Sequence, residues 1–110
     1  MADRRVTYLP EARADLVRIE ARIRDNNGPL VAADKIAVIL RKVKLLAINP
    51  STDSKPKRRT LPNGKVLRFA VVMRWWVVYE DIEDENHLVV NAIVDSVRDI
   101  PNITFHPSER

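Results

Sequence analysis

The sequence predicts an α+β fold, and three observations support this prediction. Apolar residues recur at helical spacing through most of the first half of the 110-residue chain. A tight "DNNGP" connection divides that half into two helices. Beyond residue 65 the pattern changes to β-branched and aromatic runs separated by short polar turns. We therefore expect an N-terminal strand, an antiparallel helical hairpin and a three-stranded antiparallel meander, in the order β-α-α-β-β-β.

The first strand and the first helix are predicted from the start of the chain. The segment "RRVTYL" is short and extended, and Pro10 and Glu11 after it are typical of the first positions of a helix. Four apolar residues then recur at intervals of four, three and four residues, which places them on one helical face: Ala12, Leu16, Ile19 and Ile23. We expect this amphipathic helix to end at "DNNGP", because Asn27 and Gly28 readily adopt the conformation that ends a helix.

The second predicted helix runs from Pro29 to Ile48 and is apolar around much of its circumference. One apolar stripe contains Ala32, Ile36, Ile39, Val43 and Leu46, and a second contains Val31, Val38 and Leu45. Two stripes predict packing on two sides of the helix. The short connection requires the two helices to lie antiparallel.

A loop rich in turn-forming residues, "NPSTDSKPKRRTLPNG", is expected to follow the second helix. Three strands are predicted after it, at Val66 to Val72, Trp75 to Ile82, and Leu88 to Val97. The chain has the length of one domain, which we place at residues 1–101, with residues 102–110 as a C-terminal tail.

The composition excludes several classes of site. The chain has no cysteine, which excludes disulfides and thiolate chemistry, and its two histidines, His87 and His106, are far apart in sequence. No apolar run approaches the ~20 residues that a membrane span needs, and the first ten residues lack the apolar core of a signal peptide. We expect a cytoplasmic protein with no metal, no cofactor and no small-molecule substrate.

The charges are unevenly distributed along the chain. The net charge is +4, and the segment from residue 55 to residue 74 contains no acid. An acidic segment follows at residues 80–85, around a predicted turn. We expect the first segment to form an electropositive region, here called the basic block. It contains seven basic residues: Lys55, Lys57, Arg58, Arg59, Lys65, Arg68 and Arg74.

Two arginines of the basic block interrupt predicted strands, and each needs a carboxylate partner or an anionic ligand. Arg74 can pair with Glu80 or Asp81, whereas Arg68 has no acid within ten residues on either side. Contact with an anionic partner is therefore favoured for Arg68. Trp75 and Trp76 point to opposite faces of their strand, so one is expected in the core and the other is a candidate anchor for a partner.

The order of these elements and several short motifs resemble the RelE/ParE family of bacterial toxins from type II toxin-antitoxin systems, and the ParE members in particular. The resemblance covers roughly residues 5 to 101. The motifs are "YLPEARADLVRI", the "NP" after the second helix, "LRFAVVMRWWVVYE" and "SVRDI". They supply the Pro10-Glu11-Ala12 helix start, Arg68, Arg74 five residues before Tyr79, and Arg98 followed by Asp99.

This resemblance implies a toxin that binds and inhibits DNA gyrase, that is neutralised by a cognate antitoxin (ParD-like or other), and that serves plasmid stabilisation. It implies no catalytic centre. The residues predicted to bind the target are Arg68, Arg74, Trp75, Trp76 and Arg98. Those predicted to bind the antitoxin are Leu16, Ile19, Ile36, Ile39, Val43, Arg58 and Arg59.

Two alternatives remain open at this point. RelE members cleave messenger RNA on the ribosome, and the resemblance implies that an enzyme of this kind would use Arg68, Arg74, Arg98 and Lys65. Its proton-handling groups are missing, because the C-terminal "NITFHPSER" is short and broken by proline, and His87 and His106 are most simply solvent-exposed. The other alternative is a basic nucleic-acid-binding module, supported only by the pI of about 9.8.

The chain departs from the family pattern at two positions. Members usually have Ser or Thr before the helix-opening proline, whereas Leu9 stands here and cannot cap the helix. They also tend to have Pro or Gly before the third-strand arginine, where this chain has "AVVM". The hairpin turn before Arg74 is therefore expected to be an extended, bulged crossing.

Overall fold

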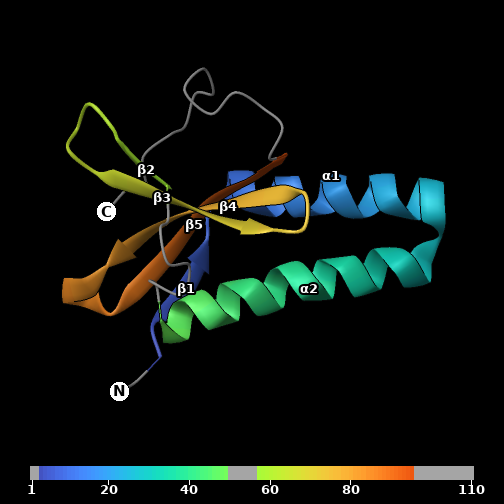
Figure 1. Cartoon of the computed structure of the whole chain (residues 1–110), viewed down its shortest axis with the longest axis horizontal. Coiled ribbons are helices and arrows are strands. Elements are labelled where there is room, and N and C mark those ends of the chain that lie inside the picture. The colour runs from blue at the N-terminus through green and yellow to red at the C-terminus, as the bar shows by residue number, and fades with distance from the viewer. Residues whose placement is uncertain (1–2, 50–56, 96–110) are drawn as a thin grey trace.

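The computed structural model describes residues 3–49 and 57–95, and its element order confirms the predicted fold class (Figure 1). The helices are α1, Pro10–Asn27, and α2, Pro29–Ile48. Within these ranges no helix is long and apolar enough to span a membrane. The strands are β1 (Arg5–Tyr8), β2 (Lys57–Thr60), β3 (Val66–Val72), β4 (Trp75–Ile82) and β5 (His87–Asp95), with a 3-10 turn at Glu83–Glu85.

The strands form one five-stranded sheet in the order β1-β5-β4-β3-β2. The first strand lies beside the last and is parallel to it, with Val6 opposite Leu88, whereas the other pairs are antiparallel. The chain therefore leaves the sheet after β1, forms the helical hairpin, and returns to complete the sheet from the other edge (Figure 1).

The strand β2 corrects the prediction that residues 49–64 form only a loop. Its backbone pairs with β3, so that Arg58 lies opposite Arg68 and Thr60 lies opposite Val66. The connection to β3 closes with a hydrogen bond of 2.7 Å from the Leu61 N–H to the Lys65 carbonyl, and Gly64 supplies the positive φ of 87° that this turn requires. A run of basic residues carries no apolar alternation, which is why the sequence pattern did not reveal this edge strand.

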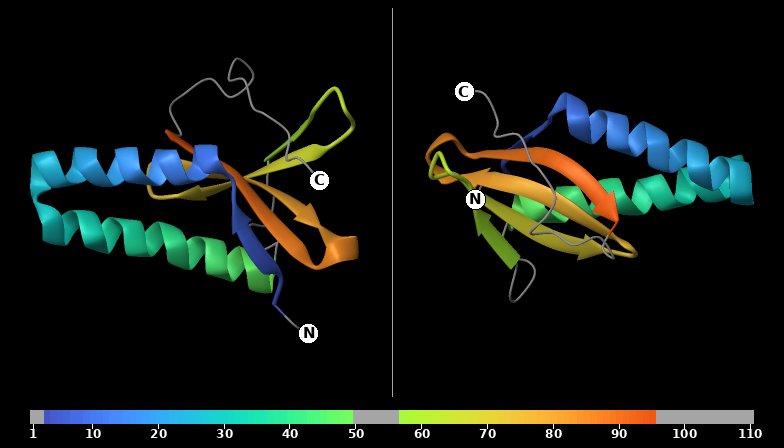
Figure 2. Two further views of the ribbon diagram at one scale, coloured as in Figure 1. Left: turned by 180° about the vertical axis from the view of Figure 1, so that it is seen from behind. Right: turned by 90° about the horizontal axis from the view of Figure 1, so that it is seen from above.

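Both helices cover the same face of the sheet (Figure 2). Their stripes and the facing strand residues form the main core, in which Ile39, Leu46, Val77 and Tyr79 are almost completely buried. As expected, no side chain caps α1 at Leu9, and Gly28 adopts a positive φ of 92° between the helices. The prediction of packing on two sides is wrong for part of the second stripe of α2, because Val31 and Leu45 are exposed.

The opposite face of the sheet carries a second cluster of buried apolar side chains. Its buried members include Leu67, Phe69 and Val78, and Trp76 packs against them. The rings of Phe69 and Trp76 meet edge to face, with centroids 6.5 Å apart. The sheet therefore buries apolar residues on both faces.

The hairpin turn between β3 and β4 differs from the expected bulged crossing. Val72 pairs with Trp75, so that the turn consists of Met73 and Arg74 alone, and Met73 takes the positive φ of 52° that Gly or Asn more often supplies. The irregularity lies instead between β4 and β5. There the register shifts between Val78 and Tyr79, which places Asn91 in a bulge.

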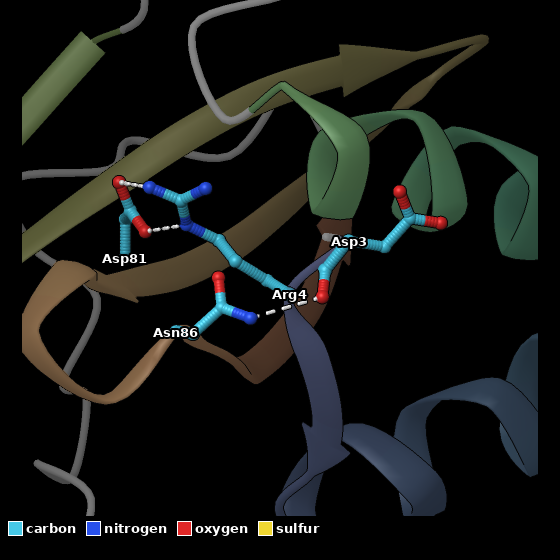
Figure 3. A network of polar contacts seen from close by, with 4 residues as sticks. All are labelled: Asp3, Arg4, Asp81 and Asn86. Atoms are coloured by element: carbon cyan, nitrogen blue, oxygen red, sulfur yellow. Dashed lines mark hydrogen bonds and ion pairs between the residues drawn. The ribbon is translucent and has the colours of Figure 1, made fainter. Parts of the chain in front are cut away.

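Polar contacts fix the N-terminal segment to the end of β4 and to the turn before β5 (Figure 3). The Arg4 side chain donates from Nε to Asp81 Oδ1 at 2.5 Å, and both side chains are largely buried, with exposed fractions of 16% and 2%. The Asn86 side chain donates to the Asp3 carbonyl at 3.1 Å. Asp81 therefore pairs with Arg4. The sequence had instead suggested Asp81 as a partner of Arg74.

Candidate partner-binding pocket

A pocket of about 690 Å³ lies where the end of the helical hairpin meets the turn between β3 and β4. Its walls come from the C-terminal half of α1, from α2, from the Met73–Arg74 turn and from the end of β5. The apolar part of its lining includes Ile19, Ile23, Trp75 and Ile93. We call this site the hairpin pocket.

The charged lining of the hairpin pocket is strongly unbalanced. Four cationic side chains, Arg18, Arg22, Lys35 and Arg74, face a single carboxylate, Asp95. Arg74 donates from Nη2 to Asp95 Oδ2 at 2.7 Å, and its guanidinium lies 5.9 Å from the centre of the Trp75 ring. The predicted partners of Arg74, Glu80 and Asp81, are therefore wrong, because its carboxylate comes from the neighbouring strand.

A buried carboxylate joins the two walls of the pocket. Asp15 on α1 accepts a hydrogen bond of 2.9 Å from the Ile93 N–H on β5, and it also pairs with Arg18. Asp15 is only 9% exposed, so this link lies mostly away from water. The sequence pattern did not reveal this residue, since only its position on the apolar side of α1 could have indicated it.

The two tryptophans point to opposite faces of the sheet, as expected, and the structure shows which one faces the helices. Trp75 is 8% exposed, belongs to the core under α1 and α2, and also lines the hairpin pocket. Trp76 is half-buried on the opposite face. The two rings therefore cannot contact the same surface of a partner.

Arg68 lies at a different site from Arg74. It is half-buried on β3, opposite both Arg58 on β2 and Tyr79 on β4. Val72 ends the paired part of β3, so about 13 Å of strand separates Arg68 from the Arg74 turn. Within the described residues Arg68 forms no ion pair.

Arg68 and Lys65 line an open cleft of about 460 Å³ together with four acids: Glu80, Asp81, Glu83 and Asp84. Lys65 Nζ lies 3.9 Å from Glu80 Oε1, and Asp81 is paired with Arg4. The structure therefore brings together two of the four residues named for RNA cleavage, but in an acidic cleft. Arg98 lies outside the described residues, as do His106, the predicted tail and the last two residues of the predicted third strand of the meander.

The tyrosines and the histidine of the described residues are buried or half-buried. Tyr79 is fully buried opposite Arg68, and burial raises the pKa of the Tyr8 phenol above its ordinary value. His87 is 8% exposed, which corrects the expectation of a surface residue. Its two ring nitrogens are in polar contact with β1, Nδ1 with Arg5 Nη2 at 3.4 Å and Nε2 with Thr7 Oγ1 at 2.7 Å.

The residues predicted to bind the antitoxin do not share one surface. Ile39 and Val43 are buried in the core and offer no surface to a partner, which corrects that part of the prediction. Leu16, Ile19 and Ile36 are half-buried against the core. Helical periodicity identifies an apolar face but does not show whether the protein's own core or a partner covers it. Arg58 and Arg59 lie on the edge strand β2, where Arg58 is exposed and Arg59 half-buried.

Comparisons with known proteins agree with this architecture. Residues 6–100 match the family model described as the ParE toxin of the type II toxin-antitoxin system, parDE. A solved structure titled "Chromosomal ParDE TA system from P. aeruginosa" superposes with a TM-score of 0.67 at 17% identity, over 84% of this chain and 95% of that chain. At this identity the likeness shows the fold. No curated protein matches the chain.

Proposed function

Because the chain belongs to the ParE toxin family of type II toxin-antitoxin systems, we propose that it arrests growth by binding DNA gyrase and has no catalytic centre of its own. Binding is proposed to involve Arg74 and the apolar lining of the hairpin pocket, with Arg68, Trp76 and Arg98 as further contacts. Trp75 is only 8% exposed, so we expect it to support this surface by packing beneath it and to offer little contact area to the partner.

One observation carries the preference for binding over RNA cleavage. A ribonuclease that promotes attack of a 2′-hydroxyl on phosphate needs cations and an accessible acid or base around one phosphate. Arg68 and Arg74 occupy separate sites, and Tyr79, the tyrosine opposite Arg68, has no exposed surface. Within the described residues the two arginines line different clefts, so neither cleft brings both of them to one phosphate.

The antitoxin is proposed to cover the outer surface of the helical hairpin and the basic edge strand. Val31 and Leu45 lie about four turns apart on the same face of α2. They are 37% and 47% exposed. Apolar residues at this spacing suit an amphipathic helix, and the exposed Arg58 suits an acidic segment beside it. A partner folding on this surface would remove Val31 and Leu45 from water. The gyrase and the antitoxin both imply that the protein acts in the cytoplasm.

A second candidate function, ribosome-dependent cleavage of messenger RNA, is favoured by a single feature. Lys65 and Arg68 line one cleft, and the RelE resemblance implies both residues for RNA cleavage. The four acids of the same cleft would repel an RNA backbone, which argues against it.

The two functions are distinguished by inducing the gene alone in bacteria. We expect the DNA damage response to rise while primer extension on transcripts shows no new ends at codon positions. The control is a strain that carries the gene with an early stop codon. New transcript ends at codon positions, with no damage response, would move the protein to the RelE class.

A further inference from the structure

The hairpin pocket has an excess of positive charge that the fold itself does not use. Arg18 is paired with Asp15 and Arg74 with Asp95, but Arg22 and Lys35 have no ion pair within the described residues. Both side chains are exposed and line the same pocket from two different helices. Arg22 and Lys35 line one cavity whose single carboxylate, Asp95, is already paired with Arg74, and this arrangement indicates an anionic ligand.

The inner lining of the pocket is apolar, so an anion alone would not be complementary to it. Ile23, Trp75 and Ile93 are buried residues at its base, each at most 8% exposed, and Ile19 extends this apolar wall. An inorganic anion or a nucleic-acid backbone would leave this apolar surface in contact with water. A ligand that places one large apolar side chain against it gains the free energy of burying that group.

We infer that the hairpin pocket is a docking site for an acidic peptide segment that carries one large apolar side chain. The apolar side chain would occupy the base beside Trp75, while carboxylates of the segment would meet Arg22 and Lys35 at the rim. Asn26 and Asn27 also line the pocket and offer side-chain amides to a peptide backbone. The Asp15 bond to Ile93 holds the two walls in place before the ligand arrives.

This inference rests on the proposed function only in treating the pocket as a protein-binding site, and it names the chemistry of the segment that binds there. A surface for nucleic acid would instead need a basic track with accessible stacking platforms or groove-reading residues. The charge and the apolar base therefore favour a peptide over a nucleic acid.

The test uses the full chain and a fluorescently labelled synthetic peptide of aspartate, glutamate and alanine with one central leucine, followed by anisotropy. We expect saturable binding that weakens about tenfold or more when Arg22→Ala and Lys35→Ala are combined. The matched control combines Arg41→Ala and Lys44→Ala, which removes the same charge from exposed positions of α2 outside the pocket. This control is expected to change the affinity by less than about twofold.

Two further peptides separate the parts of the proposal. Replacing the leucine by alanine should weaken binding about tenfold, and replacing the acids by lysines should abolish it. If Arg22→Ala with Lys35→Ala lowers solubility, Arg22→Gln with Lys35→Gln replaces it. The inference is overturned if the leucine peptide does not bind, if both charge variants lose affinity equally, or if the alanine peptide binds as well as the leucine peptide. None of these measurements involves gyrase, so their failure leaves the proposed target to be judged separately.

Discussion

Replacing Trp75 with alanine is expected to lower the free energy of unfolding by about 3 to 5 kcal/mol, because it removes a large aromatic side chain from a closely packed core. The ring is 8% exposed and packs under both helices. A loss of this size is a large part of the stability of a domain of 110 residues. Chemical denaturation followed by far-UV circular dichroism measures the effect.

Trp76→Ala is the matched control for this prediction, because it removes the same side chain from the neighbouring position on the other face. Trp76 is half-buried and meets Phe69 edge to face at 6.5 Å, so we expect a loss of about 1 to 2 kcal/mol. A larger loss for Trp76→Ala than for Trp75→Ala would show that the assignment of the two rings to their faces is wrong.

Replacing Arg4 with alanine is expected to cost about 3 kcal/mol, since it leaves the carboxylate of Asp81 buried without a cation. The side chain of Asp81 is 2% exposed, and Arg4 is its ion-pair partner at 2.5 Å (Figure 3). The loss is measured by urea denaturation of the single variant at neutral pH.

The double variant Arg4→Ala with Asp81→Ala tests the cause of this loss. Removing both charges should recover part of the stability, because no unpaired carboxylate then remains in the interior. Equal stability of the Arg4→Ala variant and the unmodified protein would show that water already solvates Asp81. The pair would then contribute nothing to anchoring the N-terminal segment.

The helices and the central strands were predictable because local signals mark their ends. Pro10 and Pro29 open the two helices where the sequence places them, and Gly28 separates them. The predicted bounds of β3 and β4 agree with the structure, since aromatic and β-branched runs are typical of strands buried on both faces.

The features that the sequence did not reveal depend on contacts between distant segments. Asp81 pairs with Arg4 across 77 residues, and Ile93 donates to Asp15 across 78 residues. His87 looked exposed beside an acidic turn, but the parallel pairing of β1 with β5 buries it between strands. No local pattern encodes which strand will pair with β1, so these partners could not be predicted.

The candidate site was predicted in part. The sequence indicated Arg74, Trp75 and Ile19 separately, and the structure places all three around the hairpin pocket. It did not indicate Arg22 or Lys35, because charged residues on the outer faces of amphipathic helices are ordinary. Their significance comes only from the way the hairpin and the β3–β4 turn enclose one cavity.

The most direct measurement of the central claim is a supercoiling assay in which purified gyrase is titrated with the folded protein. Gyrase binding by this protein predicts inhibition that becomes complete near equal amounts of the two proteins and that is reversed by the cognate antitoxin, while messenger RNA in a parallel ribosome assay stays intact. Gyrase that remains fully active in a large excess of folded protein, together with cleavage of that RNA, would contradict it.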